Sequence, residues 1–336
     1  MHWRKIYLVI FIIALSSVFS TELYWRHLSY RPTVVDDKNL WSVHRQRISD
    51  KPQTLAVLGA SRIQLGFSPE VFHSLYPDWT LANLTINANY PVAALADLAD
   101  NTEFRGVVLM AIDARSLIHI FHSMQQPWVD YYHRDFGPGL WLHSQMATFK
   151  QSRLVTANAE FSLTRRFVAW LGDSGKPHVT YIVFDRSRFA KADYQQIKVD
   201  YHLRERFNAM RKSAAEFTVP TADEWLESNE KLLHWIGLIQ QRGGKVILIR
   251  MPTNQESWEV DEEHLPRRDY WDRLTGQEGI LSLHFKDWPE LDSYPLPDGS
   301  HLDFRDKQAF TRDLLHKLKE RGYMPDSTGQ SGVRQQ

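Results

Sequence analysis

The chain has 336 residues, 43% of them hydrophobic, which suits one large α/β domain with a substantial core. Its 40 basic and 40 acidic residues cancel, so no overall charge draws it to nucleic acid, and no nucleic-acid partner is expected. The absence of cysteine excludes disulfides, thiol catalysis, cysteine-ligated metals and a lipid anchor on cysteine.

The N-terminal segment has the pattern of a membrane-targeting helix. A basic start precedes an uncharged apolar run, residues 6–21, whose length lies between a signal-peptide core and a full membrane span. Tyr24 and Trp25 follow where the membrane interface would lie. The favoured interpretation is a single-pass anchor, residues 6–25, in the inner (cytoplasmic) membrane, with the main domain in the periplasm or outside the cell. The alternatives are a signal peptide cleaved after Ser20 and a soluble enzyme that packs this segment.

Beyond the N-terminal segment, short apolar runs alternate with helical patterns. Continuous apolar strands separated by helices are typical of a mostly parallel sheet covered on both faces. The sequence therefore predicts a three-layer α/β/α sandwich with a mostly parallel five-stranded sheet, flavodoxin-like in outline. The strands are expected at residues 54–58, 80–86, 106–112, 245–251 and 280–285. Helices are expected at residues 92–99, 222–242 and 303–321, the last with Asp303 as its N-cap.

These patterns divide the chain into segments. Residues 1–25 are the anchor or signal, residues 26–51 a charged linker, and residues 52–324 the α/β domain. Residues 116–220 interrupt the alternation of strands and helices and are predicted to form a mainly helical insertion. Residues 325–336 are polar and are expected to be disordered.

Two short motifs contain candidate catalytic residues. Gly59-Ala60-Ser61 ends the first predicted strand, where a glycine allows a tight turn and the serine is exposed above the sheet. Asp298 and His301 stand three residues apart in a turn before the last helix, so the carboxylate can hold the imidazole in one tautomer. Taken singly, each motif has an ordinary alternative, a helix-capping serine and a surface turn.

Together the two motifs, about 240 residues apart, resemble those of the SGNH/GDSL hydrolase superfamily. The sequence is most similar to membrane-anchored SGNH-like proteins that act on exported polymers, as in polysaccharide O-acetylation and D-alanyl transfer to teichoic acids. The resemblance covers the core strands and both motifs but not the insertion. It implies that Ser61 is the nucleophile of a triad with Asp298 and His301.

The sequence departs from the family where the oxyanion donors are expected. The family's second block usually supplies a glycine N–H, whereas this chain has Asn87-Ala88-Asn89. The N–H of Ala88 or a side-chain amide of either asparagine remains available as a donor. The family's third block usually supplies an asparagine, whereas the third predicted strand here ends in Asp113.

An ionised Asp113 cannot donate a hydrogen bond and would oppose a developing oxyanion. Arg62, Arg115 or Arg250 is expected to neutralise it or to take over its role. The departures leave two functions open. The first is an acyl-ester hydrolase or O-acyltransferase that acts on a cell-envelope polysaccharide, with an acyl donor and a membrane-bound O-acyltransferase as partners. The second is a non-catalytic polymer-binding or assembly protein on the same fold.

The remaining polar residues indicate neither a metal nor an organic cofactor. The 15 histidines form no HExxH pattern, and no glycine-rich nucleotide loop is present. Arg186 and Arg188, in the predicted insertion, are expected to be solvated charges.

Overall fold

The computed structural model describes residues 2–158, 161, 165, 167–168, 181–215 and 218–326. Its centre is a five-stranded sheet in which every pair of neighbouring strands is parallel. The order along the sheet is β2-β1-β3-β6-β7. The strands are β1 (Thr54–Leu58), β2 (Thr80–Asn83), β3 (Val107–Ala111), β6 (Lys245–Arg250) and β7 (Leu281–His284). All five predicted strands are therefore confirmed, with ends that differ from the prediction by up to three residues.

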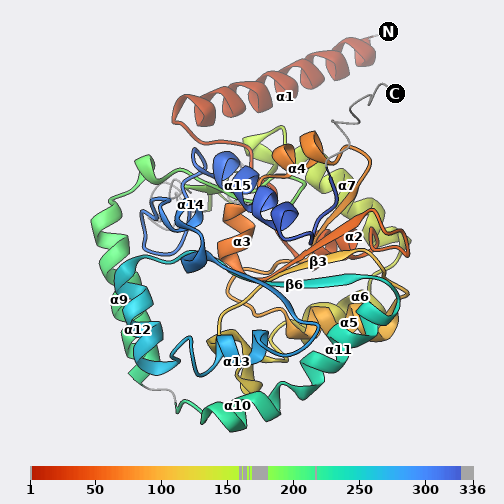
Figure 1. Cartoon of the computed structure of the whole chain (residues 1–336). Coiled ribbons are helices and arrows are strands. Elements are labelled where there is room, and N and C mark those ends of the chain that lie inside the picture. Colours follow the sequence, from red (N-terminus) through yellow and green to blue (C-terminus); the bar gives the residue numbers. More distant parts are fainter. Residues whose placement is uncertain are drawn as a thin grey trace, which may run out of the picture.

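Helices cover both faces of the sheet, as Figure 1 shows, which confirms the predicted three-layer sandwich. Successive β1 residues point to opposite faces, with Ala56 and Leu58 in one core and Leu55 and Val57 in the other. One face packs against α5 (Val92–Asn101), α10 (Ala222–Ser228), α11 (Glu230–Gln241) and α13 (Trp271–Thr275). The other packs against α3 (Ser61–Gly66), α4 (Pro69–Leu75), α14 (Pro289–Asp292) and α15 (Lys307–Glu320).

The order of these strands determines where a ligand site is expected. Chain connections run in opposite directions from β1 and β3, so a crevice opens at the carboxyl ends of these two neighbours. Ser61 follows β1 and Asp113 follows β3. The topology therefore brings these two predicted site residues to the same edge of the sheet.

The predicted helix over residues 222–242 is in fact two helices, α10 and α11, which meet at Asn229. Asn229 is buried, and its side-chain amide donates to the carbonyls of Leu117 and Trp225. Asparagine competes with the helix by bonding neighbouring backbone groups, which explains the break.

The last helix also begins later than expected. Asp306, not Asp303, occupies the N-cap position of α15. Asp303 instead accepts hydrogen bonds from the backbone N–H groups of Tyr194 and Arg305.

The segment predicted as a linker, residues 26–51, is partly built into the domain. It contains α2 (Lys38–Arg45), whose Leu40 and Trp41 are buried and whose N-cap is Asp37. The indole N–H of Trp41 donates to the carbonyl of Leu84, just beyond β2. The linker prediction was wrong for this part. The charged residues around α2 dominate the composition of the segment, so its one apolar face was not recognised in the sequence.

The insertion, residues 116–220, is mainly helical where it is described. It contains α6 (Gln126–Arg134), α7 (Pro138–Gln151), α9 (Val199–Ala215) and a small antiparallel pair, β4 (Ile182–Val183) and β5 (Lys191–Ala192). α12 (Gln255–His264) follows β6. Most of the predicted tail, residues 327–336, lies outside the described residues.

The N-terminal helix α1 (His2–His27) lies apart from the sandwich (Figure 1). Residues 3–27 have a mean hydropathy of 2.1 in their most apolar window, long and apolar enough to cross a membrane, and little of that window is buried. An anchor and a signal sequence both have these properties. One N-terminal apolar helix is thus established, and the choice between its two interpretations remains a prediction.

Buried Lys307 is expected to make the stability of the domain depend on pH. Burial lowers the pKa of this amine to about 7, while it donates to the carbonyl of Ala190. Between pH 7 and 10.5 the unfolded chain therefore binds more protons than the folded chain, so stability rises with pH. In the wild type, the free energy of unfolding should therefore rise by at most about 1.4 kcal/mol per pH unit. We expect this rise to be absent in Lys307→Met. Urea titrations at pH 7, 8 and 9 measure the free energy of unfolding of both proteins. The same dependence on pH in the wild type and in Lys307→Met would contradict the prediction.

Candidate active site

Ser61 is held at the end of β1 by a turn that requires glycine. Gly59 has a φ of +147°, and a Cβ there would lie 2.6 Å from the side chain of Ile63 and 3.0 Å from that of Ala111. The chain can therefore turn closely enough to begin α3 at Ser61. As the first helical residue, Ser61 has a backbone N–H that no carbonyl of its own helix can accept.

The turn before α15 brings His301 onto Ser61. The Nε2 atom of His301 lies 2.7 Å from the Oγ atom of Ser61, and its Nδ1 atom lies 2.8 Å from the Oδ2 atom of Asp298. The other carboxylate oxygen of Asp298 accepts the backbone N–H groups of Ser300 and His301, at 3.0 and 2.8 Å. Asp298 and His301 are buried, with 3% and 4% exposed.

This arrangement constrains the protonation of the imidazole. A carboxylate only accepts hydrogen bonds, so the Nδ1 atom of His301 carries the proton that faces Asp298. The Nε2 atom then carries no proton and can accept that of the Ser61 hydroxyl. Such a constellation can generate an alkoxide nucleophile and can stabilise the imidazolium that forms.

The loop after β2 approaches the same place through Ala88. Ala88 has a φ of +57°, the left-handed region that glycine adopts most easily, at the position where the resemblance leads one to expect glycine. Asn89 is engaged within the loop, since its side-chain amide donates to the carbonyl of Asn87 and its N–H to that of Ile86. Of the three predicted donors in this loop, Ala88 lines the cavity beside Ser61.

Asp113 lies at the same cavity and is paired with Arg62. The Nη1 atom of Arg62 donates to the Oδ2 atom of Asp113 at 2.9 Å, and the N–H of Ser116 donates to Oδ1 at 2.8 Å. Burial would raise the pKa of Asp113, but Arg250, Arg62 and this N–H together hold it below its usual value. Asp113 is therefore ionised, and its charge is balanced within the site.

Arg62 also connects this carboxylate to the Asp298–His301 turn, because its Nε atom donates to the hydroxyl of Ser300 at 2.9 Å. Ser300 was not predicted as a site residue, although it stands between Asp298 and His301 in the sequence. The side chain of Arg62 thus connects Asp113, which follows β3, to the turn that contains Ser300.

Arg250, the last residue of β6, is buried behind Asp113. It donates to the carboxylate of Asp261 at 2.5 Å and to the carbonyl of Met251 at 2.9 Å. Tyr90, which the sequence analysis also left out, lines the cavity, and burial together with Asp113 raises its pKa to about 12. Its phenol therefore stays protonated and is able to donate a hydrogen bond.

The cavity beside Ser61 has a volume of about 260 Å³. Its lining residues come from the carboxyl ends of β1, β3 and β6 and from the loops after β2 and before α15. They include Ala60, Ser61, Arg62, Ala88, Tyr90, Asp113, Ser116, Arg250 and Ser300. The predicted site residues that converge here are Ser61, Arg62, Ala88, Asp113 and Arg250, whereas Asn87 and Asn89 are not among the lining residues. Within the described parts of the chain, no group of three or more His, Asp or Glu side chains is placed to hold a metal ion.

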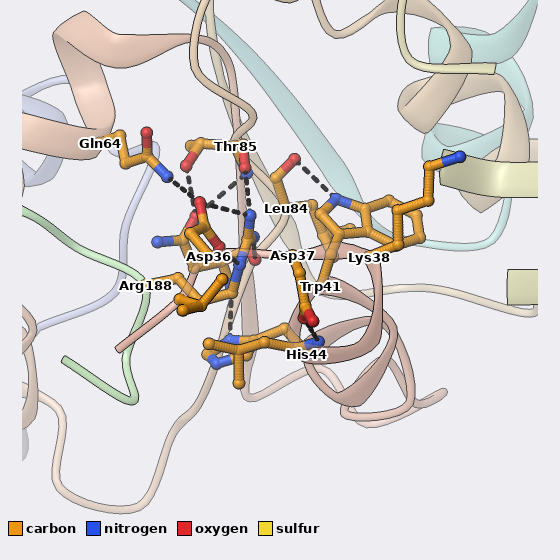
Figure 2. Close-up of polar contacts among 12 residues, drawn as sticks. Asp36, Asp37, Lys38, Trp41, His44, Gln64, Leu84, Thr85 and Arg188 are labelled. Carbon is orange, nitrogen blue, oxygen red and sulfur yellow. Dashed lines mark hydrogen bonds and ion pairs between the residues drawn. The ribbon is translucent and has the colours of Figure 1, made fainter. Parts of the chain in front are cut away.

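A second polar cluster fixes the helix that begins at Ser61 (Figure 2). The carboxylate of Asp36 accepts hydrogen bonds from Arg188, at 2.6 and 3.1 Å, and from the side chain of Gln64 in α3, at 2.9 Å. Arg188 also donates to the carbonyls of Asn83 and Thr85 at the end of β2. The cluster therefore ties the segment before α2, the insertion and α3 to one edge of the sheet.

The prediction that Arg188 is solvated was wrong, because its side chain is fully buried. Its neighbour Arg186 is exposed, as predicted, and donates to the side chain of Gln145. Neutral backbone carbonyls and one nearly buried carboxylate satisfy Arg188, and no local pattern in the sequence distinguishes the two arginines.

We expect Arg188→Met to lower the free energy of unfolding by roughly 3–5 kcal/mol, since it leaves Asp36 almost buried without its cation. Arg186→Met is the matched control and should change stability by no more than about 0.5 kcal/mol. Chemical denaturation measures both. Equal small losses in the two variants would show that the buried pair contributes little.

No family model matches the sequence, and no curated protein matches it. The solved structures similar in fold include the crystal structure of TesA, with 12% sequence identity. The match covers 80% of this chain and 98% of that chain, with a TM-score of 0.35. Because this likeness is loose, the geometry around Ser61 is the basis for assigning a function.

Proposed function

We propose that this chain is an SGNH-type serine acyl-ester hydrolase or O-acyltransferase that acts outside the cytoplasm on a cell-envelope polysaccharide. The observation that carries the proposal is the continuous hydrogen-bonded path from Ser61 through His301 to Asp298, with distances of 2.7 and 2.8 Å. Two adjacent hydrogen bonds of this length, which join half-buried Ser61 to buried His301 and Asp298 at a cavity, suit nucleophilic acyl chemistry.

In the proposed reaction, the Oγ atom of Ser61 attacks the acyl carbonyl while the Nε2 atom of His301 takes its proton. Asp298 stabilises the imidazolium that results. When the tetrahedral intermediate collapses, His301 returns the proton to the departing sugar oxygen, and the acyl group stays on Ser61 as an ester. Water then releases the acid, or a second sugar hydroxyl accepts the acyl group.

The negative oxygen of the tetrahedral intermediate needs donors close to Ser61. The N–H of Ser61 at the start of α3 and that of Ala88 in its left-handed turn are the proposed donors. Asp113 would repel this oxygen, but its ion pair with Arg62 offsets the charge. The phenol of Tyr90 is a third group at the cavity that is able to donate.

The substrate class follows from the resemblance and from the apolar helix α1 rather than from the cavity itself. An anchored enzyme outside the inner membrane meets envelope polymers, and an acyl group for transfer would have to arrive from a donor. A membrane-bound O-acyltransferase would be a suitable source of that group. A cleaved signal would place the same chemistry in a soluble form of the domain.

Labelling with a fluorophosphonate probe tests the proposal. The purified full chain should become covalently labelled, with mass spectrometry locating the label on Ser61. His301→Ala should remain unlabelled, because without its base the hydroxyl is not activated.

The second candidate is a polymer-binding or assembly protein, which the carboxylate of Asp113 favours because it lies where the related enzymes usually have a donor. This candidate requires an unlabelled wild-type protein that nevertheless binds the polysaccharide. A labelled protein that releases acetate from an acetylated polysaccharide would exclude it.

A further inference from the structure

The helix α7 in the insertion is inverted, with polar residues inside and large apolar residues outside. Its buried residues are Ser144 and Thr148. On the outside, Trp141, Leu142 and Met146 are 42%, 53% and 59% exposed, and Phe149 is 49% exposed. With 3.6 residues per turn, these four side chains span an arc of about 140° on one side of the helix. A soluble surface rarely presents such a stripe unless something covers it.

The charged residues of this stretch of the chain are all basic. Residues 136–159 contain no acidic residue, while Lys150 and Arg153 follow the apolar stripe and are exposed. The guanidinium of Arg153 lies over the ring of Phe149 at 3.7 Å. Tryptophan, leucine and phenylalanine beside lysine and arginine are the composition of helices that lie in a membrane interface.

The carboxyl end of α7 adjoins the place where α1 leaves the domain. Glu22 of α1 accepts the backbone N–H groups of Val155 and Thr156, at 2.9 and 3.0 Å. The side chain of Arg26 donates to the carbonyl of Arg153. In the last turn of α1, Trp25 packs against Tyr30 and Val155 in a small apolar cluster. Figure 1 places α7 on the side of the sheet that faces α1.

We propose that the exposed stripe of α7 (Trp141, Leu142, Met146 and Phe149) rests in the surface of the same lipid bilayer that α1 enters. The domain would then be attached to the membrane at two points. α1 would span the bilayer, and the stripe of α7 would lie in the bilayer surface. Lys150 and Arg153 would meet anionic lipid headgroups. Two attachments restrict the rotation of the domain about α1, so the Ser61 cavity would keep one orientation relative to the membrane.

The absence of cysteine allows a direct test on the full chain. Met146→Cys and Phe149→Cys each introduce one thiol for a polarity-sensitive dye, and Glu227→Cys on α10 is the control. Glu227 is exposed on the helix layer across the sheet from α1. The labelled proteins are reconstituted in vesicles of phosphatidylcholine and phosphatidylglycerol, with and without brominated acyl chains. Flotation with the vesicles establishes separately that the protein is bound to the membrane.

In protein that floats with the vesicles, we expect the dye at positions 146 and 149 to show blue-shifted emission. Brominated lipid should quench most of that emission, while the emission of the dye at position 227 should be unaffected. Water-like emission at positions 146 and 149 would overturn the proposal. The proposal would also be overturned if brominated lipid left the shifted emission unchanged while dilution of the protein abolished the shift. That result would indicate that a second copy of the chain covers the stripe. These outcomes do not depend on ester turnover, so they are separate from a failure of the proposed enzymatic function.

Discussion

Replacing Ser61 with alanine is expected to lower ester turnover on the order of 10⁶-fold, as loss of the nucleophile does in serine hydrolases. The proposed covalent intermediate forms on its Oγ atom, which lies 2.7 Å from the Nε2 atom of His301. Hydrolysis of p-nitrophenyl acetate by the purified full chain measures the effect. Release of acetate from an O-acetylated polysaccharide then tests the substrate class.

The matched control is Ser74→Ala, which removes an exposed serine of α4 and should leave turnover unchanged. Removing the hydroxyl of Ser61 leaves β1, α3 and the turn at Gly59 intact, so the free energy of unfolding should change little. A Ser61→Ala variant that keeps wild-type turnover would show that ester cleavage, if present, occurs elsewhere. A variant that fails to fold would appear as a changed denaturation midpoint.

The second large effect is expected for Asp298→Asn, which should lower kcat about 10⁴-fold while preserving the shape of the turn. The asparagine oxygen still accepts the N–H groups of Ser300 and His301. Its amide nitrogen, however, is a hydrogen-bond donor that now lies opposite the Nδ1 atom of His301. The imidazole is then favoured in the opposite tautomer, with the proton on Nε2, where it cannot accept the proton of Ser61.

Two measurements separate this tautomer effect from loss of structure. The denaturation midpoint should remain near that of the wild type, and the proton NMR signal of the hydrogen bond between His301 and Asp298 should disappear. Asp306→Asn at the start of α15 is a control that lies outside the Ser61–His301–Asp298 path. If Asp298→Asn retains more than a tenth of wild-type kcat, the buried carboxylate serves the fold rather than the reaction.

Arg62 explains how the site accommodates the carboxylate of Asp113, which stands where the resemblance to SGNH hydrolases leads one to expect an asparagine. Its guanidinium reaches Asp113 on one side and Ser300 on the other, with both contacts at 2.9 Å. Asp113 contributes an acceptor for Arg62 and for the N–H of Ser116, so it organises the cavity edge instead of donating to the substrate. This role could not be derived from the sequence, because it depends on side chains from three separate segments.

The fold could be predicted from the sequence because its signals are local. Apolar runs such as residues 54–58 and 107–111 determine which segments are buried strands, and the intervening helical patterns determine that both faces of the sheet are covered. The helix break at Asn229 and the late start of α15 were missed, because single polar side chains with distant partners decided them. The apolar face of α2 was missed because the charges around it dominate the segment.

The sequence by itself determined the strand-and-helix alternation, the apolar N-terminal helix and the two motifs that contain Ser61 and His301. These depend on residues that are close along the chain, where composition and spacing already restrict the conformation. Only the tertiary structure decided the 2.7 Å approach of those two side chains, the pairing of Arg62 with Asp113 and the burial of Arg188. The physical reason is that each of these contacts joins segments at least 50 residues apart, and their geometry exists only once the sheet has assembled and excluded water around them.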